Sequence, residues 1–325
     1  MNTANYFINE SSSSISSSTA IHYWEPHTSS IDFCETNYIV SNYIVEVHNA
    51  FSSLWVFSLL GFIGIAYGNP TKERMFTIVY GILFFIGIGS AALHATLHWI
   101  FQSSDELPMI YLVISVVYCI LEVDSPSPRG EEGAKTKYKH PRLPYYLLFL
   151  CCMNTIIYFS FQQIYIIFLS TFGVMTLLSF SLHVRLGWKH YQKLRSSNTT
   201  MTNNSKIALK FYYWHYITFL VIATPIWILD QFRCNKLLPY YNLLPFPLKG
   251  CTLHVVWHAC AGLAAHTIIQ FIIASRLDFL GKECQIKRIL GILPVVTIKK
   301  TMNTAATTTT AQDDSNKTEK NNNYV

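Results

Sequence analysis

Charged side chains are scarce in this chain. Only 13% of its 325 residues are Asp, Glu, Lys or Arg, whereas soluble globular proteins carry roughly 25%. Hydrophobic residues make up 51% and aromatic residues 15%, which excludes an ordinary soluble globular protein. The net charge of +6 does not indicate a nucleic-acid partner, because Lys and Arg lie in short clusters between apolar runs, as in loops that flank membrane spans.

Basic residues are absent from the start of the chain, before Lys72. The first 20 residues are rich in serine and contain neither a basic n-region nor an apolar h-region. Both regions mark a cleavable signal peptide. We therefore expect the first apolar run to act as its own insertion signal.

Long apolar runs follow, and most approach or exceed the ~20 residues that a helix needs to cross the hydrocarbon core of a bilayer. They predict an all-α, polytopic membrane protein with seven transmembrane helices. The predicted spans are Val45–Ala66, Met75–His98, Leu107–Val123, Pro144–Phe161, Ile164–Leu186, Ile207–Leu229 and Leu253–Ile273. Longer polar connections are expected at Asp124–Arg142 and Gly187–Lys206.

Lys and Arg also predict the orientation. Seven spans place the two termini on opposite sides of the membrane. With the N-terminus outside, all but three of the 24 Lys and Arg residues fall in inside segments, and the exceptions are Arg233, Lys236 and Lys249. Because inside loops carry the excess of Lys and Arg, we expect a lumenal N-terminus and a cytosolic C-terminus.

This topology divides the chain into three parts. Residues 1–44 form a lumenal N-terminal segment, residues 45–275 the seven-helix transmembrane domain, and residues 276–325 a cytosolic tail. The tail becomes rich in Thr and Asn, so we expect its end to be disordered.

Polar residues inside spans are costly and mark candidate functional sites. On this topology they gather on the lumenal face. Ser90 and His94 lie near the lumenal end of the second span, Asp105 opens the third, and His254 and His258 open the seventh. An acidic segment precedes the first span on the same side. Four separate stretches therefore converge on one membrane face.

The histidine spacing is typical of a metal site. His254 and His258 are one helical turn apart on one face, and three His plus water is the open catalytic form of a zinc site. Two further histidines leave the ligand set open, because His98 pairs with His94 and His266 lies two turns beyond His258. Paired histidines on different spans also suit a b-type haem, and a single interfacial His would simply bond to backbone or headgroups.

The acidic segment has two interpretations. Asp32, Glu35, Asn37 and Glu46 supply the hard oxygen ligands that calcium prefers. Their spacing does not match an EF-hand loop, however, and a solvated lumenal stretch would have the same composition. Both interpretations stay open on the residues alone.

Four segments are similar to the alkaline ceramidases, in an order and spacing that hold from about Tyr23 to Pro294. They are Tyr23–Asn49, Gly89–Leu97, Asp105–Tyr111 and His254–Gly262. The Asp105–Tyr111 run, Asp-Glu-Leu-Pro-Met-Ile-Tyr, matches the family without a change and is highly specific. The sequence is therefore identified as a member of that family, a group of seven-helix hydrolases whose wider superfamily includes the adiponectin receptors.

The resemblance implies a role for individual residues. It implies zinc on His94, His254 and His258, and a catalytic pair of Ser90 and Asp105. The calcium ligands that it implies are Asp32, Phe33 through its carbonyl, Glu35, Asn37 and Glu46. It also implies a disulfide between Cys34 and Cys234.

Two departures from the family pattern concern pocket shape. Phe33 stands where relatives usually have Trp, and a ligand that acts through its backbone should survive that change. Val255 and Val256 replace bulkier or aromatic residues, so the shape of the acyl or base pocket differs while the chemistry does not.

The implied activity is zinc-dependent hydrolysis of the ceramide amide to a sphingoid base and a free fatty acid, in the endoplasmic reticulum or Golgi membrane. Two alternatives remain. One is a receptor-like member of the superfamily with little turnover. The other is a proton-coupled transporter with Asp105, Glu122 and Asp230 as its relay, although the sequence has neither the inverted repeat nor the paired broken helices of such proteins.

Overall fold

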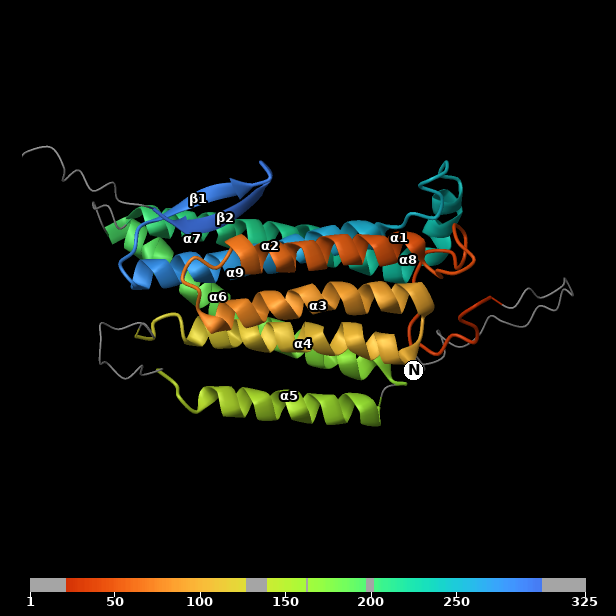
Figure 1. Cartoon of the computed structure of the whole chain (residues 1–325), viewed down its shortest axis with the longest axis horizontal. Helices are drawn as coiled ribbons and strands as arrows, with labels where there is room; N and C mark the ends of the chain where they lie inside the picture. The colour runs from red at the N-terminus through yellow and green to blue at the C-terminus, as the bar shows by residue number, and fades with distance from the viewer. Residues whose placement is uncertain (1–21, 127–138, 162, 197–201, 300–325) are drawn as a thin grey trace, which may run out of the picture.

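The chain forms a bundle of long helices that run side by side along its longest axis (Figure 1). The structure is a computed structural model and describes residues 22–126, 139–161, 163–196 and 202–299. Within these ranges seven helical segments are long and apolar enough to cross a membrane, as predicted. The protein is therefore a multi-pass membrane protein with an all-α bundle.

The helices follow the predicted order. The first span is built from α1 (Val47–Ser53), a π-helical stretch η1 (Leu54–Ser58) and α2 (Leu59–Tyr67). Single spans follow as α3 (Arg74–Thr96), α4 (Trp99–Leu121), α5 (Leu143–Ser160) and α6 (Tyr165–Ser196). The sixth span comprises α7 (Thr202–Tyr216), the π-helical η2 (Ile217–Ala223) and α8 (Thr224–Asn242), and α9 (Leu253–Phe279) is the last.

Several predicted boundaries were wrong. The sixth span ends at Asn242 and not at Leu229. The third span begins at Trp99 and not at Leu107, so Asp105 lies inside the helix and does not open it. The connection expected at Gly187–Lys206 is mostly helical, because α6 continues to Ser196 and α7 begins at Thr202. Hydropathy mispredicted these helix ends because the helical turns there are polar, although they belong to the same helices as the apolar runs.

A β-hairpin follows α9 where the sequence predicted only a polar tail. Strands β1 (Cys284–Ile289) and β2 (Leu293–Ile298) pair antiparallel. Leu290 and Gly291 in the turn have positive φ, as the tight turns of hairpins require. The hairpin packs on α7 and α9, at the end of α9 away from His254 and on the side of the bundle opposite α5 (Figure 1).

Burial is uneven among the helices. The main hydrophobic cluster joins α3, α9 and their neighbours, with Phe76, Leu83 and Phe271 completely buried. α5 lies at the edge of the bundle (Figure 1) and packs mainly on α4. Apolar side chains such as Phe85 and Leu177 point outward and are 63% and 70% exposed. A helix that is apolar all round is typical of a membrane span.

α3 and α4 approach each other closely at Gly89. A Cβ atom on Gly89 would lie well inside the van der Waals radius of the Ser104 carbonyl group and close to the Asp105 amide nitrogen. Only glycine therefore permits this backbone-to-backbone contact. The contact sets the position of Asp105 relative to Ser90, the next residue on α3.

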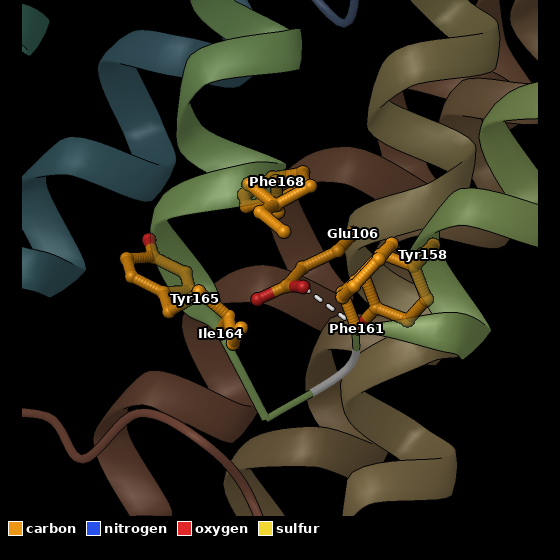
Figure 2. A pocket seen from close by; sticks show the side chains of 7 residues that line it. Glu106, Tyr158, Phe161, Ile164, Tyr165 and Phe168 are labelled. Carbon is orange, nitrogen blue, oxygen red and sulfur yellow. Dashed lines mark hydrogen bonds between the residues drawn. The ribbon is translucent and has the colours of Figure 1, made fainter.

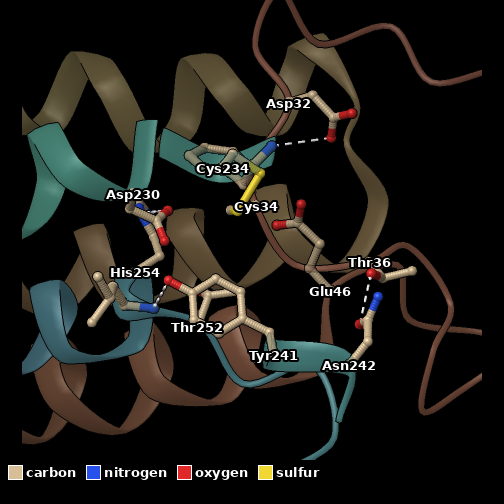
Figure 3. Close-up of a disulfide and its surroundings, with 12 residues drawn as sticks. Asp32, Cys34, Thr36, Glu46, Asp230, Cys234, Tyr241, Asn242, Thr252 and His254 are labelled. Carbon is tan, nitrogen blue, oxygen red and sulfur yellow. Dashed lines mark hydrogen bonds and ion pairs between the residues drawn. A yellow bond between two sulfur atoms is a disulfide. The ribbon is translucent and has the colours of Figure 1, made fainter. Parts of the chain in front are cut away.

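The N-terminal segment lies across the end of the bundle where α1 begins. The predicted disulfide between Cys34 and Cys234 is confirmed and ties the segment to α8, with Cα atoms 5.3 Å apart (Figure 3). Nearby, the Thr36 hydroxyl donates to Asn242 Oδ1 at 3.0 Å. The segment also caps α3, because the backbone amides of Val45 and Glu46 donate to the carbonyls of its last turn, which otherwise lack partners.

We predict that Gly89→Ala destabilises the protein, whereas Gly81→Ala on the same helix does not. The new methyl at position 89 meets backbone that cannot move aside, and overpacking of this kind costs about 1–3 kcal/mol. A Cβ at position 81 has no atom within 4 Å, so alanine there should be neutral or stabilising by up to about 1 kcal/mol. Thermal unfolding of the purified variants measures both effects, and equal melting temperatures would contradict the packing described for Gly89.

Candidate metal centre

Three histidines meet at the end of the bundle beneath the N-terminal segment. His94 comes from the last turn of α3, and His254 and His258 come from the first two turns of α9. One ring nitrogen from each lies within 4.8 Å of the others. All three side chains are buried, with at most 2% of each residue exposed. They form the only group of this kind in the described part of the chain.

The Nδ1 atom of each histidine ring has a polar neighbour outside the cluster. His94 Nδ1 lies 2.6 Å from Glu46 Oε2, and His258 Nδ1 lies 2.8 Å from the Ser52 hydroxyl. His254 Nδ1 is 3.7 Å from Asp230 Oδ2. Partners of this type fix the tautomer and the ring orientation of metal-binding histidines.

The donor set fits a zinc ion. His258 Nε2, the ring nitrogen that does not face Ser52, is buried and has no hydrogen-bond partner among the described residues, and a buried polar atom without a partner is costly. Three neutral imidazoles on rigid helices are a known catalytic zinc set. The ring centroids of the three imidazoles lie only 4.6–5.3 Å apart, so no flat macrocycle fits between any two of the rings and the geometry disfavours a haem.

The two competing histidines lie elsewhere. His98 is the residue that precedes α4 and is not in the cluster. His266 uses both ring nitrogens in other contacts, 2.9 Å from the Pro294 carbonyl oxygen and 3.4 Å from the Tyr80 hydroxyl. Geometry therefore selects one set of three from the five histidines that spacing alone left open.

Ser90 and Asp105 are in contact with each other, and Ser90 belongs to the same helix as His94. Ser90 is one turn before His94 on α3, so both point to the same face of the helix. The side chains of Ser90 and Asp105 interact across the close contact at Gly89. A hydroxyl and a carboxyl are thus held next to a histidine cluster, which is an arrangement suited to hydrogen bonding and proton transfer.

Phe33 contacts the cluster with its side chain. Its ring centroid lies 4.4 Å from that of His94 and 4.8 Å from that of His254. The sequence interpretation considered only its carbonyl. The ring therefore covers the histidines from the side of the N-terminal segment.

The acidic residues of that segment surround Glu46. Glu46 is completely buried, and its Oε1 atom has no hydrogen-bond partner in the described ranges. Burial, followed by repulsion from Asp32 and Glu35, raises the pKa of Glu46 well above its usual range. Asn37 Oδ1 is likewise buried without a described partner. Asp32 is exposed and accepts a hydrogen bond from the amide of Phe33.

Glu35 has a structural role that the sequence did not predict. Its carboxylate accepts hydrogen bonds of 2.9 and 2.8 Å from the amides of His48 and Asn49, and lies 3.0 Å from His48 Nδ1. These amides belong to the first turn of α1, whose N–H groups need acceptors. Burial nevertheless raises the pKa of Glu35.

Glu106 lines a small cavity between α4, α5 and α6 (Figure 2). The Tyr158 hydroxyl donates to Glu106 Oε2 at 2.7 Å, and Gln102 Nε2 donates to Oε1 at 2.9 Å. Gln102 in turn bonds to the backbone and side chain of Ser30. The sequence predicts no partner for Glu106, which belongs to the Asp105–Tyr111 run, because Tyr158 is distant in the chain.

The three residues of the transporter hypothesis do not form a contiguous path. Asp230 lies beside His254 and Asp105 beside Ser90, whereas Glu122 lies after α4, at its other end. There Glu122 accepts a hydrogen bond from the amide of His140 at 3.0 Å. The described contacts therefore give no support to a relay through these three.

Comparison with known proteins agrees with the motifs. A family model described as Ceramidase matches residues 25–297. The chain is 33% identical to "Putative alkaline ceramidase dcd3B" of Dictyostelium discoideum, over 85% of this chain and 96% of that protein. It is 29% identical to "Alkaline ceramidase 3" of Mus musculus, over 84% and 94%, and 25% identical to "Alkaline ceramidase" of Arabidopsis thaliana, over 86% and 96%.

Proposed function

The chain belongs to the ceramidase family, and we propose that this alkaline ceramidase hydrolyses the amide bond of ceramide with a zinc ion held by His94, His254 and His258. Family membership gives the activity of an amidohydrolase. One observation carries the zinc proposal, namely three buried imidazoles that converge within 4.8 Å and are flanked by orienting partners.

The catalytic roles follow from the chemistry of the neighbouring side chains. A zinc ion held by His94, His254 and His258 would act as a Lewis acid and would lower the pKa of water to about 7. Asp105 takes a proton from the attacking water and returns it to the leaving amine. The Ser90 hydroxyl donates a hydrogen bond to the carbonyl oxygen as negative charge develops there. The products are a sphingoid base and a free fatty acid.

We predict that replacing any one of the three histidines with Ala removes both zinc and turnover. His98→Ala and His266→Gln are the matched controls, since neither residue joins the cluster, and both should retain zinc and most activity. Metal analysis of purified protein, paired with release of sphingoid base from ceramide, measures the two properties together. Zinc retained in His254→Ala but lost in His98→Ala would overturn the ligand assignment.

Zinc content and product release, measured on the same variants, also distinguish residues that bind zinc from residues that act only in the reaction. Asp105→Asn should keep zinc and lose turnover, because its role is proton transfer. Ser90→Ala should keep zinc and lose about 10²–10³ in rate or less, the usual effect of one oxyanion donor. Zinc loss in Asp105→Asn would make that residue a ligand. Zinc in the wild-type protein without any product would favour the receptor-like alternative.

We further propose a calcium site on the N-terminal segment, made by Asp32, the Phe33 carbonyl, Glu35, Asn37 and Glu46. Its support is the buried, unpartnered oxygens of Glu46 and Asn37 in the described structure, together with the repulsion among three acidic side chains. A divalent cation with oxygen ligands would relieve both. The contacts of Glu35 with α1 leave one lone pair, on Oε2, for such a role.

Calcium binding predicts a rise in melting temperature when calcium is added to chelator-treated protein. A ligand at 100 times its Kd stabilises by about 2.7 kcal/mol. Asn37→Ala should abolish the rise, and Thr36→Ala, which loses only its bond to Asn242, should retain it. An equal rise in both variants would place calcium elsewhere.

The orientation and location are also proposals. We propose that the histidine cluster faces the lumen of the endoplasmic reticulum or Golgi, with residues 1–44 lumenal, residues 45–275 forming the catalytic bundle and residues 276–325 cytosolic. The positive-inside bias supports this orientation. It predicts a glycan on Asn9 and none on Asn198, and both sequons lie outside the described residues. Glycan mapping after expression in a eukaryotic cell tests it, and a glycan on Asn198 would reverse the topology.

A further inference from the structure

The tip of the β-hairpin is apolar and exposed. Leu290 is 80% exposed and Ile292 85% exposed, among the highest values for large apolar side chains in the described ranges. The base of the hairpin is quite different, because Cys284, Val295 and Val296 are completely buried. The hairpin is therefore fixed to the bundle by one end while the other end projects from it.

Hydrogen bonds locate the hairpin relative to the spans. The Val296 amide donates to Gln270 Oε1 at 2.6 Å, and Gln270 Nε2 donates to the Gly68 carbonyl at 3.0 Å. Gly68 directly follows the first span, which ends at Tyr67. Gln270 therefore marks the level at which that span ends.

The tip lies deeper than this level. Pro294 is two residues closer to the tip than Val296, and its carbonyl oxygen lies 2.9 Å from His266 Nε2. His266 is one helical turn before Gln270 in α9, and therefore nearer the middle of that span. The turn Leu290–Ile292 continues in the same direction. In Figure 1 the tip lies over the bundle and not beyond its end. The apolar tip therefore lies beside the membrane-spanning helices, at a depth between their two ends, where it faces lipid.

The charge of the hairpin complements a lipid headgroup. Lys287 and Arg288 are exposed next to the tip, and Cys284–Ile298 contains no acidic residue. Long basic side chains can reach back to the phosphate level while their stems lie along apolar surface. Basic residues near an anionic membrane surface are attracted to its headgroups.

We propose that this hairpin is a lipid-binding element that inserts Leu290 and Ile292 into the leaflet opposite the histidine cluster, with Lys287 and Arg288 on the headgroups of anionic phospholipids. The depth is limited to the boundary between headgroups and acyl chains. The outer edges of a two-stranded sheet have unpaired N–H and C=O groups, and these are not tolerated in the hydrocarbon core. This proposal depends on neither the zinc nor the calcium site.

A depth measurement tests the insertion. A nitroxide label is attached to Ile292→Cys in the full-length protein, reconstituted in nanodiscs of phosphatidylcholine. Gln285→Cys, exposed near the base of the same strand pair, is the matched control, and the label taken up by native cysteines of the parent protein is subtracted. Collisions with oxygen should exceed those with a water-soluble nickel chelate at position 292, and the order should reverse at position 285.

Two results would overturn insertion. Nickel access at position 292 equal to that at position 285 means that the tip lies in water. Exclusion of both reagents means that protein covers it, as in contact with a second copy of the chain.

Added phosphatidylserine tests the recognition of anionic headgroups. It should lower nickel access at position 292 severalfold in the parent background. The same lipid should have no effect when Lys287→Gln and Arg288→Gln are combined with the label. An equal response of the two proteins would remove these residues from the proposal.

Discussion

The contact between Glu46 and His94 joins the N-terminal segment to the end of α3, and the candidate site depends on both. Through its side chain, Glu46 lies 2.6 Å from His94 Nδ1, and through its amide it caps the carbonyl of the same residue at 2.9 Å. A helix that ends near a membrane interface must satisfy its last carbonyls, and a buried carboxylate needs a polar partner. One residue of the N-terminal segment meets both needs. The end of α3, the orientation of His94 and the path of the segment are therefore fixed together.

The position of Glu46 also makes the two proposed metal sites neighbours. One carboxylate oxygen lies against a proposed zinc ligand, and the other is buried without a hydrogen-bond partner among the described residues, while Asp32 and Glu35 repel the carboxylate. A cation that neutralises this group would stabilise the carboxylate form of Glu46, the form that accepts a hydrogen bond from His94. The disulfide of Cys34 holds the backbone between these residues to α8, which also carries Asp230, the neighbour of His254.

The seven spans could be predicted from the sequence because apolar composition alone identifies a membrane helix. Polar turns such as Gln102–Glu106 could not, since their helical state depends on partners in α3, α5 and the N-terminal segment. The zinc set illustrates the same limit. Spacing left His98 and His266 as candidates, the resemblance removed them, and the structure shows the physical reason in the case of His266, whose nitrogens face Tyr80 and the hairpin. The hairpin itself was missed because its strands are short and their burial depends on α7 and α9.

Loose packing of α5 is consistent with a substrate that arrives from the bilayer. This helix packs mainly on α4, and its polar ties there are the Tyr158 bond to Glu106 and the contact of Thr155 with Tyr111. In lipid, apolar surface gives little preference for protein over acyl chains, so such polar contacts and close packing decide where a helix lies. Glu106 follows Asp105 in the chain and lines a small cavity between α4, α5 and α6. Among the helices described, α5 can thus move with the smallest loss of packing, at a place next to the proposed catalytic carboxylate.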